Sequence, residues 1–96
     1  IMVKKSEIIN TAKDIISEKY DIAKSKIADD ISFRDRLLKF DVLDKYELLM
    51  TMEERFKIFV EATETQPFER SKTLSEFCDI FYRFSNPEIS KIKTKK

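Results

Sequence analysis

The sequence contains no glycine, and this absence restricts the fold. Tight turns between β-strands need backbone positions with positive φ, which glycine adopts most readily. A chain of 96 residues with two prolines and no glycine is therefore expected to be all-α. A chain of this length makes a single domain with a modest core, which we expect to span residues 1–96.

Other absences exclude classes of function. No histidine is present, which excludes histidine-based acid–base catalysis and histidine metal sites. The one cysteine, Cys78, cannot form an intramolecular disulfide, and its apolar neighbours predict a buried thiol. A net charge of +1 provides no overall field for nucleic acid, and no apolar run approaches the ~18 residues of a membrane span. We therefore expect no metal, no nucleic acid, no membrane span and no enzymatic activity.

The apolar periodicity predicts three long helices and one short helix. Their expected limits are Ser6, as N-cap, to Tyr20; Asp41 to Phe56; a short helix begun by Pro67; and a last helix opened by the Thr73–Glu76 capping box and ended at Asn86-Pro87. The long connection, residues 21–40, should lie on the core through Ile22, Ile27, Ile31 and Phe33, with a helical turn near 34–38. These elements predict a small four-helix bundle with a long loop between its first two helices and a flexible basic tail over residues 85–96.

The helix expected from Asp41 to Phe56 carries two apolar stripes instead of one. At ~100° per residue, the first stripe is typical of a core-facing side and comprises Leu48, Leu49, Met52 and Phe56. The second stripe is interleaved with carboxylates and comprises Val42, Leu43, Tyr46 and Met50. Such a mixed stripe is a poor core and indicates a docking surface. The alternative is that Tyr46 and Met50 pack under the long loop and the carboxylates form a solvated face.

An ordered series of short motifs over residues 22–84 resembles the acyl carrier protein family. The motifs are Ile31-Ser32-Phe33, Asp41-Val42-Leu43-Asp44, Glu47-Leu48-Leu49-Met50, Glu53-Glu54-Arg55-Phe56 and Thr73-Leu74. The resemblance implies a helical bundle with a long first loop. It also implies a second helix opened by Asp-Ser-Leu, whose serine carries phosphopantetheine.

The main departure from the family is at the attachment position, where this chain has Val42. Valine has no hydroxyl that could be esterified, so we expect no phosphopantetheine and no acylation there. Ser32 lies in the preceding loop and matches the family's own loop serine, which makes a relocated attachment site the less favoured interpretation. The segment 37–40 is one residue longer than in the family and lacks its glycine, so the turn into the second helix must differ.

A chain without phosphopantetheine cannot carry acyl groups as the family does. The function that we then expect to remain is partner binding through the docking surface. The resemblance, to mitochondrial members in particular, implies a small helical LYR-type partner. Through it the chain would support a cysteine desulfurase in iron–sulfur cluster biogenesis; respiratory complex I and fatty acid synthesis enzymes are further partners that it implies. We expect a mitochondrial matrix protein whose targeting segment has been removed, with the cytoplasm or a plastid as alternatives. The residues expected to bind the partner are Asp41, Val42, Leu43, Asp44, Tyr46, Glu47, Met50, Glu53 and Glu54.

Three other functions stay open on the sequence. The first is a conventional acyl carrier in fatty acid biosynthesis, with the attachment serine mutated or relocated. The second is a carrier-like regulator that occupies the enzymes of fatty acid synthesis without delivering a substrate. The third is a helical interaction module whose resemblance to the family is accidental.

Overall fold

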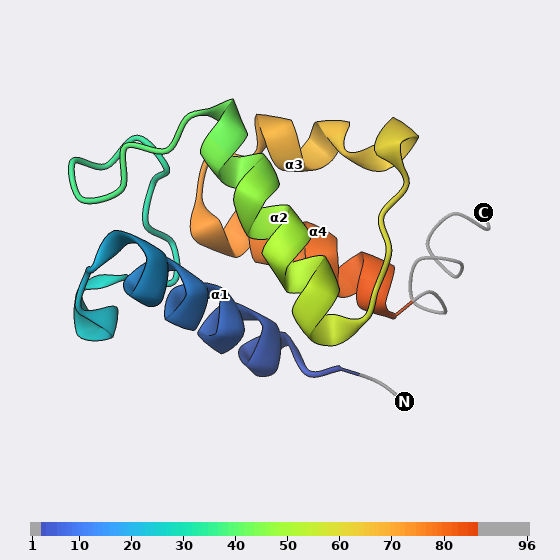
Figure 1. Cartoon of the computed structure of the whole chain (residues 1–96), viewed down its shortest axis with the longest axis horizontal. Coiled ribbons are helices and arrows are strands. Elements are labelled where there is room, and N and C mark those ends of the chain that lie inside the picture. The colour runs from blue at the N-terminus through green and yellow to red at the C-terminus, as the bar shows by residue number, and fades with distance from the viewer. Residues whose placement is uncertain (1–2, 87–96) are drawn as a thin grey trace.

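The computed structural model describes residues 3–86, whose regular elements are all helical (Figure 1). The elements are α1 (Lys5–Tyr20), the 3₁₀ turn η1 (Lys24–Lys26), α2 (Val42–Phe56), the 3₁₀ turn η2 (Ala62–Glu64), α3 (Gln66–Arg70) and α4 (Leu74–Ser85). The predicted all-α bundle of three long helices and one short helix is confirmed. The two 3₁₀ turns were not predicted.

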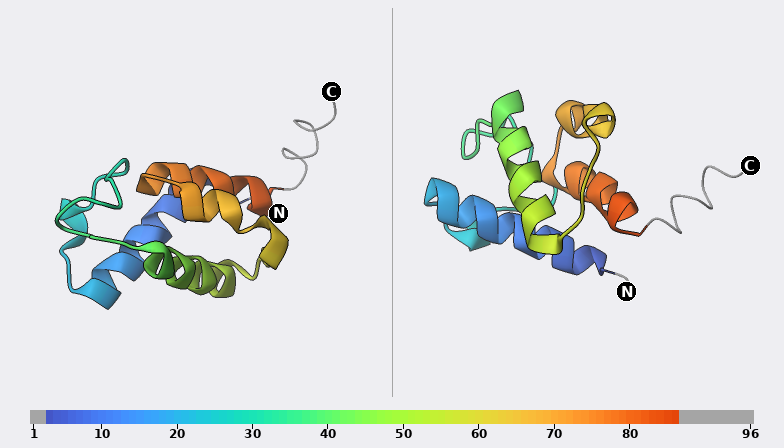
Figure 2. Two further views of the ribbon diagram at one scale, coloured as in Figure 1. Left: turned by 90° about the horizontal axis from the view of Figure 1, so that it is seen from above. Right: turned by 45° about the vertical axis from the view of Figure 1, so that its right-hand side comes forward.

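The four helices surround one core. Helix α1 packs against α2 and α4, and the short α3 packs against α2 and α4 at the other side (Figures 1 and 2). Aromatic rings fill much of the interior: the rings of Phe68 and Phe77 meet edge to face with centroids 5.0 Å apart. Cys78 is 1% exposed within this core, as predicted, and burial raises the pKa of its thiol to about 12. The predicted core residues of α2 and α4 are buried or packed against the core.

Helix α1 begins before the residue predicted to cap it. The carboxylate of Glu7 accepts a hydrogen bond from the backbone N–H of Lys4 at 3.3 Å, and Ser6 lies inside the first turn. The predicted N-cap at Ser6 is therefore wrong. The first turn is held by a carboxylate that reaches back to the residue before the helix, an arrangement that also suits the positive end of the helix dipole.

The long loop forms a fixed layer over the core. Its residues Ile27, Ile31, Phe33, Leu38 and Phe40 are buried, whereas Ile22 is only half-buried and Leu37 is 37% exposed. The loop backbone pairs with the segment before α4: Phe33 N–H donates to Lys72 O at 2.9 Å, and Leu74 N–H donates to Ile31 O at 3.0 Å. These bonds fix the loop against the start of α4, and Phe40 N–H, just before α2, donates to Phe33 O at 2.7 Å.

Among residues 3–86, three adopt the left-handed conformation that glycine would normally supply. Asp21 and Lys57 end α1 and α2 with φ of 56°, and Lys39 precedes α2 with φ of 51°. The turn into α2 was expected to differ from that of the family, because segment 37–40 lacks the family's glycine. In the structure, Lys39 makes this turn. A residue with a Cβ costs about 1–2 kcal/mol in this conformation, so each of these positions carries local strain.

The predicted tail begins too early. Helix α4 continues to Ser85, and Asn86 is 3% exposed, with its side-chain amide donating to Tyr82 O at 3.0 Å. Residues 85 and 86 therefore belong to the folded domain, and the remainder of the predicted tail, 87–96, lies outside the described residues. Across residues 3–86, no helix has both the length and the apolar character needed to cross a membrane.

Candidate functional site

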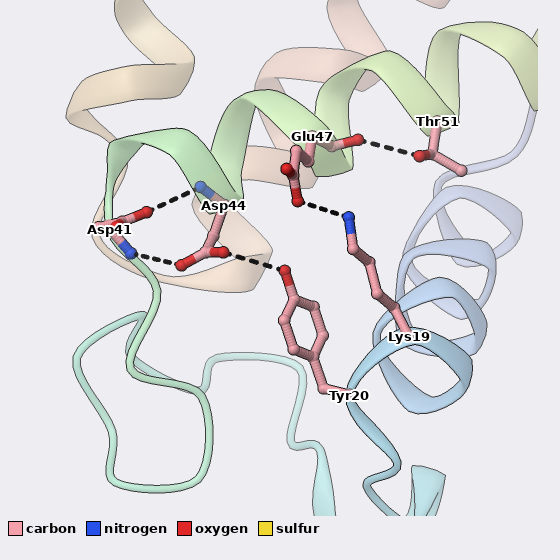
Figure 3. Close-up of polar contacts among 6 residues, drawn as sticks. All are labelled: Lys19, Tyr20, Asp41, Asp44, Glu47 and Thr51. Atoms are coloured by element: carbon pink, nitrogen blue, oxygen red, sulfur yellow. Dashed lines mark hydrogen bonds and ion pairs between the residues drawn. The ribbon is translucent and has the colours of Figure 1, made fainter.

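The first turn of α2 is closed by two aspartates. Asp41 Oδ1 accepts a hydrogen bond from Asp44 N–H at 2.9 Å, and Asp44 Oδ2 accepts one from Asp41 N–H at 3.0 Å (Figure 3). The bond from Asp44 N–H holds the pKa of Asp41 below its usual range. Because both carboxylates are engaged within the chain, their first role is to begin the helix.

Helix α1 is attached to α2 through the next polar contacts. Tyr20 donates its phenolic O–H to Asp44 Oδ1 at 3.1 Å, and the ammonium of Lys19 pairs with the carboxylate of Glu47 (Figure 3). Burial, followed by the hydrogen bond and the charge of Asp44, raises the pKa of Tyr20 to about 12. Tyr20 is therefore a neutral donor at all physiological pH values.

Helix α3 is held by two neighbouring residues of α2. The ammonium of Lys45 donates to the carbonyl oxygens of Glu69 and Ser71 at 2.8 and 2.7 Å, and Tyr46 donates its O–H to Glu69 Oε1 at 2.8 Å. Lys45 was missed by the sequence reasoning. Seen down the helix axis at ~100° per residue, Lys45 falls on the same side as the core residues Leu49 and Met52. This position was the signal that Lys45 lies close to the core.

Besides Asp41, Asp44 and Glu47, two further residues predicted to dock a partner make contacts within the fold. Tyr46 is half-buried against α3, so it does not pack under the long loop. Glu53 accepts a hydrogen bond from the backbone N–H of Val60 at 2.6 Å, which ties the chain after α2 back to the helix. Met50 is 63% exposed, so the alternative that it packs under the loop is also wrong.

A pocket of about 550 Å³ lies beside Val42, between the loop, the start of α2 and the region after α3. Val42 is 42% exposed and offers only methyl groups, so the residue at this position does not fit a covalently attached phosphopantetheine. Ser32 lines the same pocket, and its Oγ accepts a hydrogen bond from Arg34 N–H at 3.1 Å. Ser32 is thus the serine that a relocated attachment would use.

Comparison with known proteins decides the family. No family model matches the chain. The chain is 33% identical over 76 residues to an acyl carrier protein of Cyanidium caldarium, and the match covers 79% of this chain and 87% of that protein. The chain belongs to the acyl carrier protein family.

In this acyl carrier protein, the nine residues predicted to bind a partner divide into two groups. One group makes hydrogen bonds or ion pairs inside the chain and comprises Asp41, Asp44, Tyr46, Glu47 and Glu53. The other group is exposed and comprises Val42, Leu43, Met50 and Glu54. The second group is what a partner could contact without breaking a bond of the fold.

Along α2, the exposed side chains of this acyl carrier protein are apolar and acidic. Residues 3–86 contain no group of three or more cysteine, aspartate or glutamate side chains arranged to hold a metal ion. The exposed apolar side chains Leu43 and Met50 are seven residues apart on one side of α2, with Glu47 and Glu54 beside them. Apolar anchors flanked by carboxylates suit a partner that presents apolar and basic side chains.

Proposed function

We propose that this acyl carrier protein is a non-acylated, non-enzymatic subunit that binds a LYR-type helical protein. Through that partner it supports a cysteine desulfurase in iron–sulfur cluster biogenesis in the mitochondrial matrix. The observation that supports the proposal is the outer face of α2, where Leu43 is 65% exposed and Met50 63% exposed. Single exposed apolar residues are common on proteins, whereas two in register on one helix face make a usable docking stripe.

The binding energy would come from the exposed apolar side chains rather than from an acyl chain. Fully burying a side chain such as leucine or methionine contributes about 1.5–3 kcal/mol, from which the costs of association are subtracted. Leu43 and Met50 retain most of this contribution because the fold leaves them largely exposed. Glu54, also exposed, would pair with a lysine or arginine of the partner and favour the correct orientation.

The first experiment tests whether the protein can be modified with phosphopantetheine. The purified protein is incubated with a phosphopantetheinyl transferase and coenzyme A, and its intact mass is measured. We expect no added mass for the wild type and an added phosphopantetheine for Val42→Ser, which restores a hydroxyl at the attachment position. If Val42→Ser gained no mass, position 42 would not correspond to the attachment position of the family.

The same experiment tests the conventional carrier role. An adduct on the wild type would contradict the proposal. If that adduct disappeared in Ser32→Ala, the attachment site would be the serine that lines the pocket beside Val42, and a carrier role in fatty acid biosynthesis would be favoured instead.

The second experiment tests the partner. The recombinant LYR-type subunit of the desulfurase complex is titrated against the wild type, the double variant Leu43→Ala/Met50→Ala, and Arg83→Ala as an exposed control on α4. We expect the double variant to lose at least about 100-fold in affinity, which corresponds to roughly 2.7 kcal/mol, and its melting temperature to stay unchanged. No binding by the wild type would reject this partner, and binding to a ketosynthase instead would favour the regulator.

A further inference from the structure

Phe59 is the most exposed large apolar side chain in residues 3–86, at 78%. It lies just after α2, where Lys57 adopts the left-handed conformation and Ile58 N–H bonds to Glu53 O at 3.1 Å. Ile58 packs against the core and Val60 is 4% exposed, so the side chains alternate inward, outward and inward, as in an extended chain. The fold therefore holds Phe59 in solvent, where it contributes little to the core.

The backbone that carries Phe59 is fixed on both sides. Ile58 is anchored by its core contact, and the N–H of Val60 is held by the carboxylate of Glu53 at 2.6 Å. An aromatic side chain on an anchored backbone loses little conformational entropy when it binds, which is the advantage of a pre-organised contact residue. Large aromatic side chains are also frequent among the residues that dominate binding energy.

Phe59 lines a shallow, open surface groove of about 480 Å³, together with Met50, Thr51, Glu53, Glu54, Lys57 and Ile58. Both of the most exposed apolar side chains of this end of the domain, Met50 and Phe59, thus meet in one concave feature. Two carboxylates line it, those of Glu53 and Glu54, against one cation, Lys57. Glu53 is engaged by the N–H of Val60, whereas Glu54 is exposed.

We propose that this groove receives one large apolar side chain from a basic amphipathic helix of a partner protein. A lysine or arginine of the same helix, about one turn away, pairs with Glu54. The inference rests on the proposed function in that the LYR-type partner is the occupant. It extends the docking surface from Leu43 and Met50, which lie ~10 Å apart along the axis of α2, to the segment after the helix. A second copy of this chain would bring the same excess of carboxylates to the groove and is disfavoured by like charge.

A peptide titration tests the groove itself. The ¹⁵N-labelled protein is titrated with a synthetic helical peptide that carries one leucine flanked by lysines four residues away, and with a matched peptide in which glutamates replace the lysines. We expect the lysine peptide to shift the backbone resonances of residues 50–60 and to bind at least about tenfold more weakly to Phe59→Ala. Absence of shifts in 50–60, equal binding of both peptides, or equal binding to Phe59→Ala would overturn the inference.

A comparison of variants with the LYR-type subunit separates this inference from the proposed function. We expect Phe59→Ala to weaken binding about tenfold or more, Phe59→Leu to retain most of it, and Arg83→Ala to leave it unchanged. Melting temperatures should not change, since Phe59 lies outside the core. If the Leu43→Ala/Met50→Ala variant loses binding while Phe59→Ala does not, the proposed function stands and the groove is not used. If the wild type binds the lysine peptide through the groove but not the LYR-type subunit, the groove stands and the proposed partner is wrong.

Discussion

Replacing Lys45 with methionine tests how α2 holds α3. The ammonium of Lys45 donates to the carbonyl oxygens of Glu69 and Ser71 at 2.8 and 2.7 Å, at the end of α3, which finishes at Arg70. A cation at this end also suits the negative end of a helix dipole. Methionine keeps a long, flexible apolar stem and removes the charge together with both hydrogen bonds.

Three contributions set the expected loss in the free energy of unfolding: the hydrogen bonds stabilise the fold, and the other two contributions reduce the cost of removing them. Each hydrogen bond to a charged group contributes about 1.5–3 kcal/mol to stability. Partial burial lowers the pKa of Lys45, which means that the charge is held at some cost in solvation. Water can also reach the carbonyls of the variant, because Glu69 and Ser71 line the pocket beside Val42. We therefore expect a net loss of about 1–2 kcal/mol in the free energy of unfolding, and a fall of roughly 5–15 °C in Tm.

The assay is urea unfolding followed by circular dichroism at 222 nm, together with a thermal melt. Lys26→Met is the matched control, since Lys26 is exposed in the 3₁₀ turn η1. Surface substitutions of this kind change stability by less than about 0.5 kcal/mol. If Lys45→Met lost no more stability than Lys26→Met, the two hydrogen bonds of Lys45 would not be holding α3.

Three further predictions concern single groups. In a spectrophotometric titration, one of the three tyrosines should ionise near pH 12, and Tyr20→Phe should remove that step. The stability that comes from the raised pKa of Tyr20 is present below pH 10 and is lost as the pH rises toward 12. A late step that survived in Tyr20→Phe would contradict the assignment. Lys57→Gly should raise the free energy of unfolding by about 0.5–1 kcal/mol in urea, because relief of the left-handed strain exceeds the entropy that glycine loses on folding; a lower stability would show that Lys57 is not strained. Cys78, whose pKa is raised to about 12 by burial, should react with a thiol reagent only after denaturant is added, and rapid labelling of the native protein would exclude a buried thiol.

The features predicted correctly are those encoded within a few residues. Asp41 begins α2 through bonds to Asp44, and Thr73 begins α4 by accepting from Glu76 N–H at 3.2 Å. The two partners of each of these N-cap bonds are three residues apart, so the local sequence contains both of them. The second bond of the predicted Thr73–Glu76 capping box differs, since the carboxylate of Glu76 accepts from Lys72 N–H instead of Thr73 N–H. The same rule failed at Ser6, because the neighbouring Glu7 makes the competing bond to Lys4.

The features that were missed depend on residues far apart in the sequence. The partners of Lys45 lie 24 and 26 residues away, and Tyr46 meets Glu69 across 23 residues. No local pattern could assign these contacts, since they exist only once α3 has packed against α2. The carboxylates of the second stripe were likewise treated alike, although Glu47 pairs with Lys19 and Glu53 holds Val60, while Glu54 is exposed.

The helical class, the limits of α2 and its two apolar stripes follow from the sequence, because periodicity and capping are local properties of the chain. The absence of a hydroxyl at position 42 also follows from the sequence. The tertiary structure alone decided which residues of the second stripe face solvent, and that Phe59 stands outward between the inward-facing Ile58 and Val60. Exposure is set by the elements that pack on either side of a residue, and those elements are brought together only by the complete fold.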